Sequence, residues 1–312
     1  MDLPTLPWSH EILIPGSGQT RVMLVGGFGA GPESLRELGE ALAARVGATV
    51  LLSGIPRHTG DAQEFLRSRS WHFLNEAEQR FLRFWGDGGH PVLLGGYSTG
   101  AILALLIAAR HPDKVTGLVL ASPALRLARA EKQVVGYAVG SFYYVALPAA
   151  LLGSLLALAW GRHRRRVSSS HTLLGALGSM AVVAAAAAGV RSLTVPLETS
   201  LPLTRDGQQV LPPHFTRASL VTGSTLVPLQ LAARWRLRNL TLPVCLVFGE
   251  EDEVVDIRLA TLQAASSRRA ELHVVPKAPH RVVTLEECHQ IVCGFVARHA
   301  YNPPDSPAAA SP

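Results

Sequence analysis

Short apolar runs that alternate with helical patterns are the feature that most constrains the fold of this 312-residue chain. The runs are too short for buried helices, so each is predicted to be a strand covered on both faces. Helical patterns at residues 34–46, 76–85 and 101–110 separate them. The alternation predicts a mostly parallel sheet with helices on both faces. The first predicted strands are residues 22–25, 49–52, 91–94 and 115–120.

This alternation of predicted strands and helices stops after Ser122 and Pro123 for more than one hundred residues. It resumes with predicted strands at 243–248 and 271–275 and a last helix at about 285–300. The chain is therefore predicted to leave the sheet and to enter it again. The fold class is α/β with a large apolar helical cap insertion. The predicted division is a core of residues 1–123 and 239–300, an insertion of residues 124–238 and a Pro-, Ala- and Ser-rich disordered tail at 301–312.

The composition limits the kinds of partner and of site that the protein can have. Charged residues make up 17% of the chain and hydrophobic residues 48%, with a mean hydropathy of +0.22, so part of the surface is expected not to face water. The net charge is +6, but no aromatic-rich basic stripe accompanies it, and no nucleic-acid partner is expected. Three cysteines without C-x-x-C spacing predict reduced thiols rather than a disulfide framework or a metal site, with Cys245 in the core.

Gly96-Tyr97-Ser98-Thr99-Gly100 matches the pattern G-x-S-x-G. An apolar strand runs into the motif and an apolar helix runs out of it, which is the setting that a nucleophilic serine on a strand-to-helix turn requires. The glycines on either side allow the strand and the helix to approach closely. Ser98 is therefore the predicted nucleophile, against the alternative of a surface serine on a Gly-rich turn.

A Gly-rich loop, residues 26–31, follows the first predicted strand. It lacks the lysine of a phosphate-binding P-loop and the third glycine of a dinucleotide fingerprint, so no nucleotide cofactor is expected. Such a loop can instead supply a backbone amide to an oxyanion, together with the amide that follows the nucleophile. Phe28 and Thr99 are the predicted donors.

In folds that carry this serine motif, the acid and then the histidine follow the serine along the chain. Five of the nine residues 248–256 are acidic and follow an apolar strand. Asp252 is the predicted acid, with Asp256 and Glu250 as alternatives. His280 is the predicted base, because it alone follows both the acid and a strand end, whereas the remaining candidates lie within a strand or on the last helix: His273, His289 and His299.

With these motifs in view, the chain resembles the carboxylesterase and monoacylglycerol-lipase branch of the α/β-hydrolases. Residues 26–34 resemble the oxyanion loop of that branch, although Gly26 stands where histidine is usual. Residues 96–100 are similar to its nucleophile elbow, and residues 246–255 to its acid loop. Lys277 and Pro279 replace small residues before the histidine.

The resemblance implies acyl transfer by Ser98, His280 and Asp252 on a carboxylic ester, with lipid-like or acylglycerol esters as the expected substrates. No metal and no organic cofactor are implied. The triad leaves other acyl chemistry open, as in a thioesterase, a peptidase or an acyltransferase. A non-catalytic, membrane-associated homologue of the same fold is the alternative from another class.

The predicted insertion contains two long uncharged runs, residues 134–161 and 167–190, with four arginines in residues 162–166 between them. Each run exceeds the length of about 20 residues that spans a bilayer. The runs are compatible with a transmembrane hairpin, with a shallow anchor in one leaflet, or with an apolar cap over a lipid pocket. We expect membrane association through residues 134–190 with a cytoplasmic catalytic domain, since the N-terminus carries no secretory signal pattern; a soluble cytoplasmic protein is the alternative.

Overall fold

A seven-stranded sheet forms the centre of the protein. The computed structural model describes residues 11–55, 68–87, 90–164, 217–264 and 269–299, with short stretches between residues 178 and 211. The strand order is β1-β3-β2-β4-β5-β10-β11, in which β1 is antiparallel to β3 and the other neighbours are parallel. The strands are β1 (Glu11–Ile14), β2 (Arg21–Val25), β3 (Thr49–Ser53), β4 (Val92–Tyr97), β5 (Val115–Ala121), β10 (Val244–Gly249) and β11 (Ala270–Val275).

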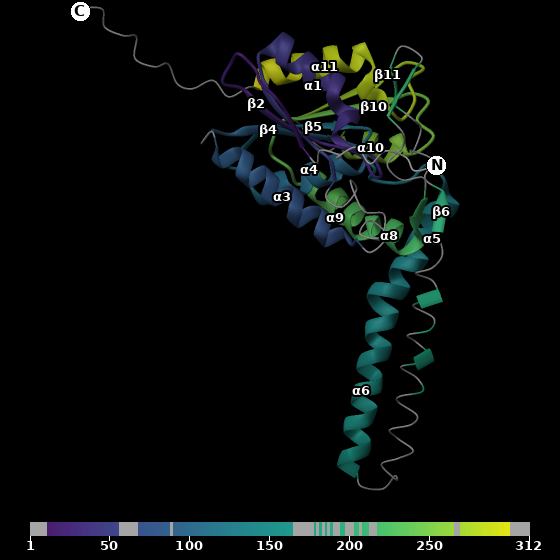
Figure 1. The fold of residues 1–312 in the computed structure, drawn as a ribbon. Helices are drawn as coiled ribbons and strands as arrows, with labels where there is room; N and C mark the ends of the chain where they lie inside the picture. Colours follow the sequence, from purple (N-terminus) through teal and green to yellow (C-terminus); the bar gives the residue numbers. More distant parts are fainter. Residues whose placement is uncertain are drawn as a thin grey trace, which may run out of the picture.

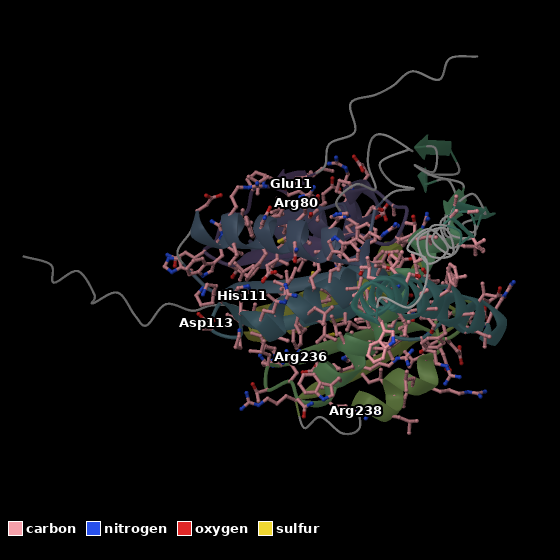
Figure 2. All side chains as sticks on the ribbon, turned by 90° about the horizontal axis from the view of Figure 1, so that it is seen from below. Glu11, Arg80, His111, Asp113, Arg236 and Arg238 are labelled. Atoms are coloured by element: carbon pink, nitrogen blue, oxygen red, sulfur yellow. The ribbon has the colours of Figure 1, made fainter. Side chains whose placement is uncertain are left out.

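The six predicted strands lie within three residues of the observed ones, and the mostly parallel α/β sheet is confirmed. Strand β1 was not predicted, because at the edge of the sheet three of its residues are only half-buried and Leu13 is exposed. A charged side chain holds it there: Glu11 pairs with Arg80 of helix α3 (Ser70–Gly86) at 3.1 Å and with Arg83 of the same helix at 2.6 Å. Figure 2 shows Glu11 and Arg80 side by side.

Helices cover both faces of the sheet (Figure 1). Helices α1 and α11 lie over one face, and α3, α4 and α9 lie over the other. The alternation along β2 matches this, because Val22 and Leu24 face the first layer whereas Met23 and Val25 face the second. The helices of the two layers, with the short helices beside them, are η1 (Pro32–Leu35), α1 (Arg36–Val46), α3 (Ser70–Gly86), α4 (Thr99–Arg110), α9 (Leu226–Arg238), α10 (Ile257–Ala264), η3 (Val282–Thr284) and α11 (Glu286–His299).

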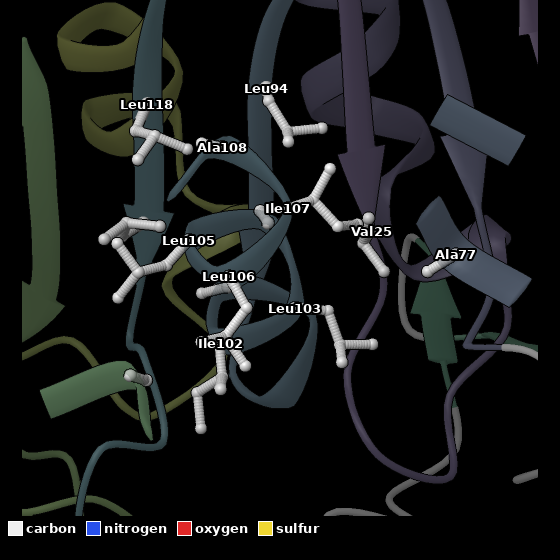
Figure 3. Close-up of a cluster of buried hydrophobic side chains, with 14 of the residues drawn as sticks. Val25, Ala77, Leu94, Ile102, Leu103, Leu105, Leu106, Ile107, Ala108 and Leu118 are labelled. Carbon is white, nitrogen blue, oxygen red and sulfur yellow. The ribbon is translucent and has the colours of Figure 1, made fainter. Parts of the chain in front are cut away.

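Helix α4 is the most deeply buried helix of the second layer. Residues from Thr99 to Ala108 are all buried, and its leucines and isoleucines pack between the sheet and the neighbouring helices (Figure 3). It begins directly after the end of β4, at the same edge where β2, β10 and β11 also end, because these strands are parallel. Ligand sites of open α/β sheets lie beyond this edge.

Between β5 and β10 the chain runs through elements outside the central sheet. Helix α5 (Ala130–Ser141), the π-helical turn η2 (Phe142–Ala146) and α6 (Leu147–Arg164) follow one another, and α6 extends far from the sheet layers (Figure 1). We call residues 142–164 the apolar arm. The division into core and insertion stays a prediction. The remaining elements are two strand pairs and a short helix: β6 (Thr194–Pro196) with β9 (Arg217–Ser219), β7 (Leu203–Arg205) with β8 (Gln208–Leu211), and α8 (Leu220–Ser224).

The first long uncharged run, residues 134–161, is divided among α5, η2 and α6. Helix α6 ends at Arg164, and its last turn also contains Arg162. Most of the second run, residues 167–190, lies outside the described residues. Within the segments that the structure describes, we find no helix with both the length and the apolar character needed to cross a bilayer.

Candidate active site

The turn between β4 and α4 holds Ser98 in a strained conformation. Its φ of 55° and ψ of −114° lie in a region that residues with a side chain rarely adopt. Gly96 and Gly100 make the turn possible, since a Cβ at position 96 would collide with the Gly100 backbone and one at position 100 with the carbonyl of Val25. The predicted strand–turn–helix setting of Ser98 is therefore present.

His280 lies between Ser98 and Asp252. Its Nε2 is 3.1 Å from Ser98 Oγ, and its Nδ1 is 2.8 Å from Asp252 Oδ2. An ionised carboxylate only accepts hydrogen bonds, so Nδ1 carries the proton and Nε2 is left to accept the one on Ser98. The side chains of His280 and Asp252 are 8% and 1% exposed, which excludes most competing water. The geometry thus brings together three groups that are 182 and 28 residues apart along the chain.

A turn downstream of Asp252 fixes its carboxylate. Asp252 Oδ1 accepts hydrogen bonds from the backbone amides of Val254 and Val255 at 2.9 and 3.0 Å. Burial opposes the charged form of this carboxyl, but the hydrogen bond and charge of His280, helped by the two amides, outweigh it and hold its pKa below the ordinary value. Asp252 therefore stays charged beside the imidazole at neutral pH.

The alternative acids and bases lie elsewhere. Asp256 Oδ1 accepts the amide of Arg258, and Glu250 Oε2 accepts the amide of Lys277. The remaining histidines have other neighbours: His273 lies 3.5 Å from Glu271, His289 lies 2.9 Å from the Val283 carbonyl, and the ring of His299 packs on Phe295. Among these candidates, within the described part of the chain, Asp252 and His280 contact each other, and only His280 contacts Ser98.

The Gly-rich loop after β2 lies against the nucleophile turn. A Cβ at Gly27 would be 3.0 Å from the Tyr97 ring and 3.5 Å from Ser98 Cβ. Gly29 has a φ of 73°, which lets the loop turn tightly beside Phe28. Phe28 is buried next to Phe73, and Thr99 is buried at the start of α4. Both predicted amide donors thus belong to segments that border Ser98.

Sequence reasoning missed Tyr97, which packs against His280, and Arg281, which contacts Tyr97. The Tyr97 ring lies 5.1 Å from the His280 ring, centroid to centroid, and the Tyr97 hydroxyl is hydrogen-bonded by Arg281. Burial raises the pKa of Tyr97 well above its usual value, so the hydroxyl is neutral. The G-x-S-x-G pattern assigns no role to its second residue, so only the packing could identify Tyr97.

The thiols take no part in this site. Cys245, Cys288 and Cys293 are free and buried, and burial raises the pKa of the Cys245 and Cys288 thiols to about 12. Neutral thiols at this depth are unreactive. In the described part of the chain no cluster of three or more His, Cys, Asp and Glu side chains could hold a metal ion.

The fold and this constellation together define a class of protein. A family model described as alpha/beta hydrolase fold matches residues 20–285, and the chain belongs to that family. The predicted fold and family are thereby confirmed. No curated protein sequence matches the chain significantly.

Solved structures with the same fold include several lipolytic enzymes. One, from work on the metagenome-derived lipolytic enzymes LipS and LipT, has a TM-score of 0.66 and 17% identity over 94% of this chain and 99% of its own. A monoacylglycerol lipase from Paleococcus ferrophilus has a TM-score of 0.61 and 17% identity over 93% and 98%. A soluble variant of monoglyceride lipase from Saccharomyces cerevisiae has a TM-score of 0.61 and 15% identity over 94% and 92%. At these identities the likeness concerns the fold.

Proposed function

We propose that the protein is a serine hydrolase that cleaves carboxylic esters through an acyl-enzyme on Ser98. The observation that supports this most directly is the double contact of His280, whose Nε2 lies 3.1 Å from Ser98 Oγ and whose Nδ1 lies 2.8 Å from Asp252 Oδ2. A nucleophile paired with a base, and a base oriented by a third group, are the arrangement that activates a hydroxyl at neutral pH.

In the first half of the reaction, Ser98 Oγ attacks the ester carbonyl while its proton moves to His280 Nε2. The Oγ–carbon bond forms, and negative charge develops on the carbonyl oxygen. His280 then gives the proton to the alcohol oxygen as the carbon–oxygen bond of the ester breaks. Water repeats the sequence on the acyl-enzyme and releases the carboxylic acid. Asp252 stabilises the imidazolium in both halves because its depressed pKa keeps it charged.

The backbone amides of Phe28 and Thr99 are the proposed donors to the developing oxyanion. Each belongs to a segment that borders Ser98, namely the loop after β2 and the first turn of α4. The first turn of a helix adds its unpaired amides and its positive dipole end, which favour negative charge. One such donor typically contributes about 3 kcal/mol to the transition state.

A fluorophosphonate probe tests the nucleophile. It should label the protein at Ser98, and Ser98→Ala should abolish both the labelling and the hydrolysis of p-nitrophenyl esters. A panel of esters of rising chain length, beside thioesters and aminoacyl amides, separates the proposed esterase from other acyl chemistry. Labelling that persists in Ser98→Ala, or turnover of thioesters or amides only, would contradict the proposal.

We further propose lipid-like esters as substrates and a lipid surface as the partner of the apolar arm. Within the arm, none of the described side chains is buried. Five of its large apolar side chains are more than half exposed: Val145, Leu152, Leu155, Leu156 and Trp160. Exposed apolar surface of this extent marks an interaction site.

Lipid suits this surface better than a protein partner does. The exposed positions occupy most of the circumference of α6, whereas a docked protein covers one face of a helix. Residues 162–166 of the sequence, where the arm ends and the chain continues, include four arginines, and arginines complement anionic headgroups. Seating on a lipid layer would place the hydrolase beside esters that partition into lipid.

Brominated lipids test this proposal, because bromine quenches tryptophan fluorescence at short range. Vesicles of brominated phosphatidylglycerol should quench the protein, and Trp160→Phe should remove most of that quenching. Trp235→Phe is the matched control, since Trp235 is 59% exposed but lies on α9 against the body. Failure to bind vesicles, with a dimer seen by sedimentation, would show that a second copy covers the arm instead.

A further inference from the structure

Three residues other than glycine have a positive φ among the described residues, and Lys277 is one of them, with a φ of 56°. The strain at Ser98 belongs to the nucleophile turn. Lys277 follows β11 and lies three residues before His280. Lys277 is the third residue of a turn in which the Ala278 amide donates to the Val275 carbonyl at 3.4 Å. A positive φ at this position suits glycine and strains a lysine, so a further contact is needed to stabilise the turn.

The side chain of Glu250 makes that contact. Glu250 Oε2 accepts the backbone N–H of Lys277 at 2.9 Å. Around this bond the two loops touch through their backbones: the Glu250 amide donates to the Val275 carbonyl at 3.0 Å and the Glu251 amide to the Ala278 carbonyl at 2.9 Å. The acid loop after β10 and the histidine loop after β11 therefore form one unit.

Prolines make Lys277 the adjustable point of the histidine loop. Pro276 and Pro279 have φ fixed by their rings, and Ala278 is restricted because a proline follows it. A change of φ at Lys277 is therefore passed along the loop rather than absorbed within it. Such a change would move the side chain of His280. Its contacts of 3.1 Å to Ser98 and 2.8 Å to Asp252 would lengthen if the ring were displaced.

We propose that Glu250 is a positioning residue, which holds Lys277 in the left-handed conformation and thereby aims His280 at both Ser98 and Asp252. The inference rests on the proposed function, since His280 has to act as the base for its aim to matter. Glu250 itself is exposed and touches no reacting atom. It acts through a hydrogen bond, so a neutral acceptor of the same length should replace it in part.

Four variants test this role: Glu250→Ala, Glu250→Gln, Glu251→Ala and the double variant Glu250→Ala/Lys277→Gly. Glu250→Ala should lower kcat for p-nitrophenyl butyrate about fivefold with KM unchanged, which corresponds to the loss of one ordinary hydrogen bond. Glu250→Gln should recover much of this loss. In the double variant, Lys277→Gly should restore the kcat lost in Glu250→Ala, because glycine needs no contact to adopt a positive φ. Glu251→Ala is the matched control, since Glu251 is also exposed and contributes through its backbone amide.

NMR of the His280 ring separates this inference from the proposed function. The proton on Nδ1, shared with Asp252, should give a downfield signal in the unaltered protein that broadens in Glu250→Ala and is retained in Glu251→Ala. Equal kcat values and equal signals in Glu250→Ala and Glu251→Ala would overturn the positioning role. An unlabelled Ser98 in the unaltered protein would instead overturn the proposed function, while the ring signal would still report whether Glu250 orients His280.

Discussion

Helices α4 and α6 are two apolar helices of one chain in opposite surroundings. α4 has a single charged residue, Arg110 at its end, and is buried from Thr99 to Ala108. α6 is uncharged from Leu147 to Gly161, yet Leu152, Leu155 and Leu156 are more than half exposed. Figure 1 shows the first beneath the sheet and the second extending away from it.

An apolar helix has to be covered, but its composition does not determine what covers it. For α4 the cover is the sheet and the helices α3 and α9, because its position directly after β4 places it there. For α6 the described part of the chain offers no comparable layer, and we propose lipid in that place. Burial of α4 thus follows from topology, and for α6 we propose that it follows from an external partner.

The largest expected effect comes from placing a charge in each helix. Leu105→Asp would put a carboxylate at a fully buried position of α4, which costs several kcal/mol and should unfold the protein. Leu156→Asp, at a position 61% exposed, should change the free energy of unfolding by less than about 0.5 kcal/mol. Urea denaturation followed by circular dichroism measures both. A Leu156→Asp variant as unstable as Leu105→Asp would mean that the arm is covered by protein in solution.

The second effect concerns catalysis. Asp252→Asn removes the charge that orients and stabilises His280, and kcat should fall by roughly 10³- to 10⁴-fold. Replacing Leu152 and Leu156 in the arm by glutamine should leave kcat/KM on a short, water-soluble ester within about twofold, because the arm is remote from the reacting groups. Steady-state rates on p-nitrophenyl acetate compare them. A large loss in the arm variant would show that the two regions are coupled.

Glycines in the two helices give a third, smaller contrast. Gly100 lies in the first turn of α4, where a Cβ would collide with the carbonyls of Val25 and Gly26, so Gly100→Ala should cost about 1–3 kcal/mol. Gly153 in α6 has no atom within 4 Å of such a Cβ, and Gly153→Ala should stabilise the helix by up to about 1 kcal/mol. Thermal unfolding of both variants shows the sign of each change. Destabilisation by Gly153→Ala would reveal packing against that face of the arm.

Local patterns were sufficient for the buried core and insufficient at its edges. Strands such as β4 and β10 are continuous apolar runs, so period and length identify them. Strand β1 has no such run, because its place depends on the ion pairs of Glu11 with a helix far along the chain. The apolar runs at 134–161 and 167–190 predicted a need for cover, but its source depends on surroundings that the sequence does not encode locally.

In the candidate site, too, some features could be predicted from the sequence and others could not. Motif and chain order selected Ser98, Asp252 and His280, and the structure brings both Ser98 and Asp252 within hydrogen-bonding distance of His280; their catalytic roles stay a proposal. The contacts that orient them were not predictable. Tyr97 packs against His280, and Arg281 contacts Tyr97. Glu250 was considered as an alternative acid, whereas its carboxylate accepts the amide of Lys277. A contact between two loops cannot be predicted from the local sequence of either loop.

The smallest expected effect is a pH dependence that the core has and the arm lacks. The folded pKa of Asp252 lies below its unfolded value of about 3.9, so the unfolded chain binds the proton more readily. This carboxyl therefore contributes stability that is complete above about pH 5 and is lost as the pH falls through the folded pKa. Asp252→Asn lacks that contribution, and its free energy of unfolding should approach that of the unaltered protein as the pH is lowered from 6 to 3. The other carboxylates are common to both proteins and cancel in this difference.

The arm supplies the control. α6 contains no acidic residue, so the free energy of unfolding of the glutamine variant of Leu152 and Leu156 should differ from that of the unaltered protein by a constant amount over the same pH range. Urea denaturation at stepped pH measures both differences, and a gap for Asp252→Asn that stays constant on acidification would show that the buried carboxylate is not stabilised in its charged form.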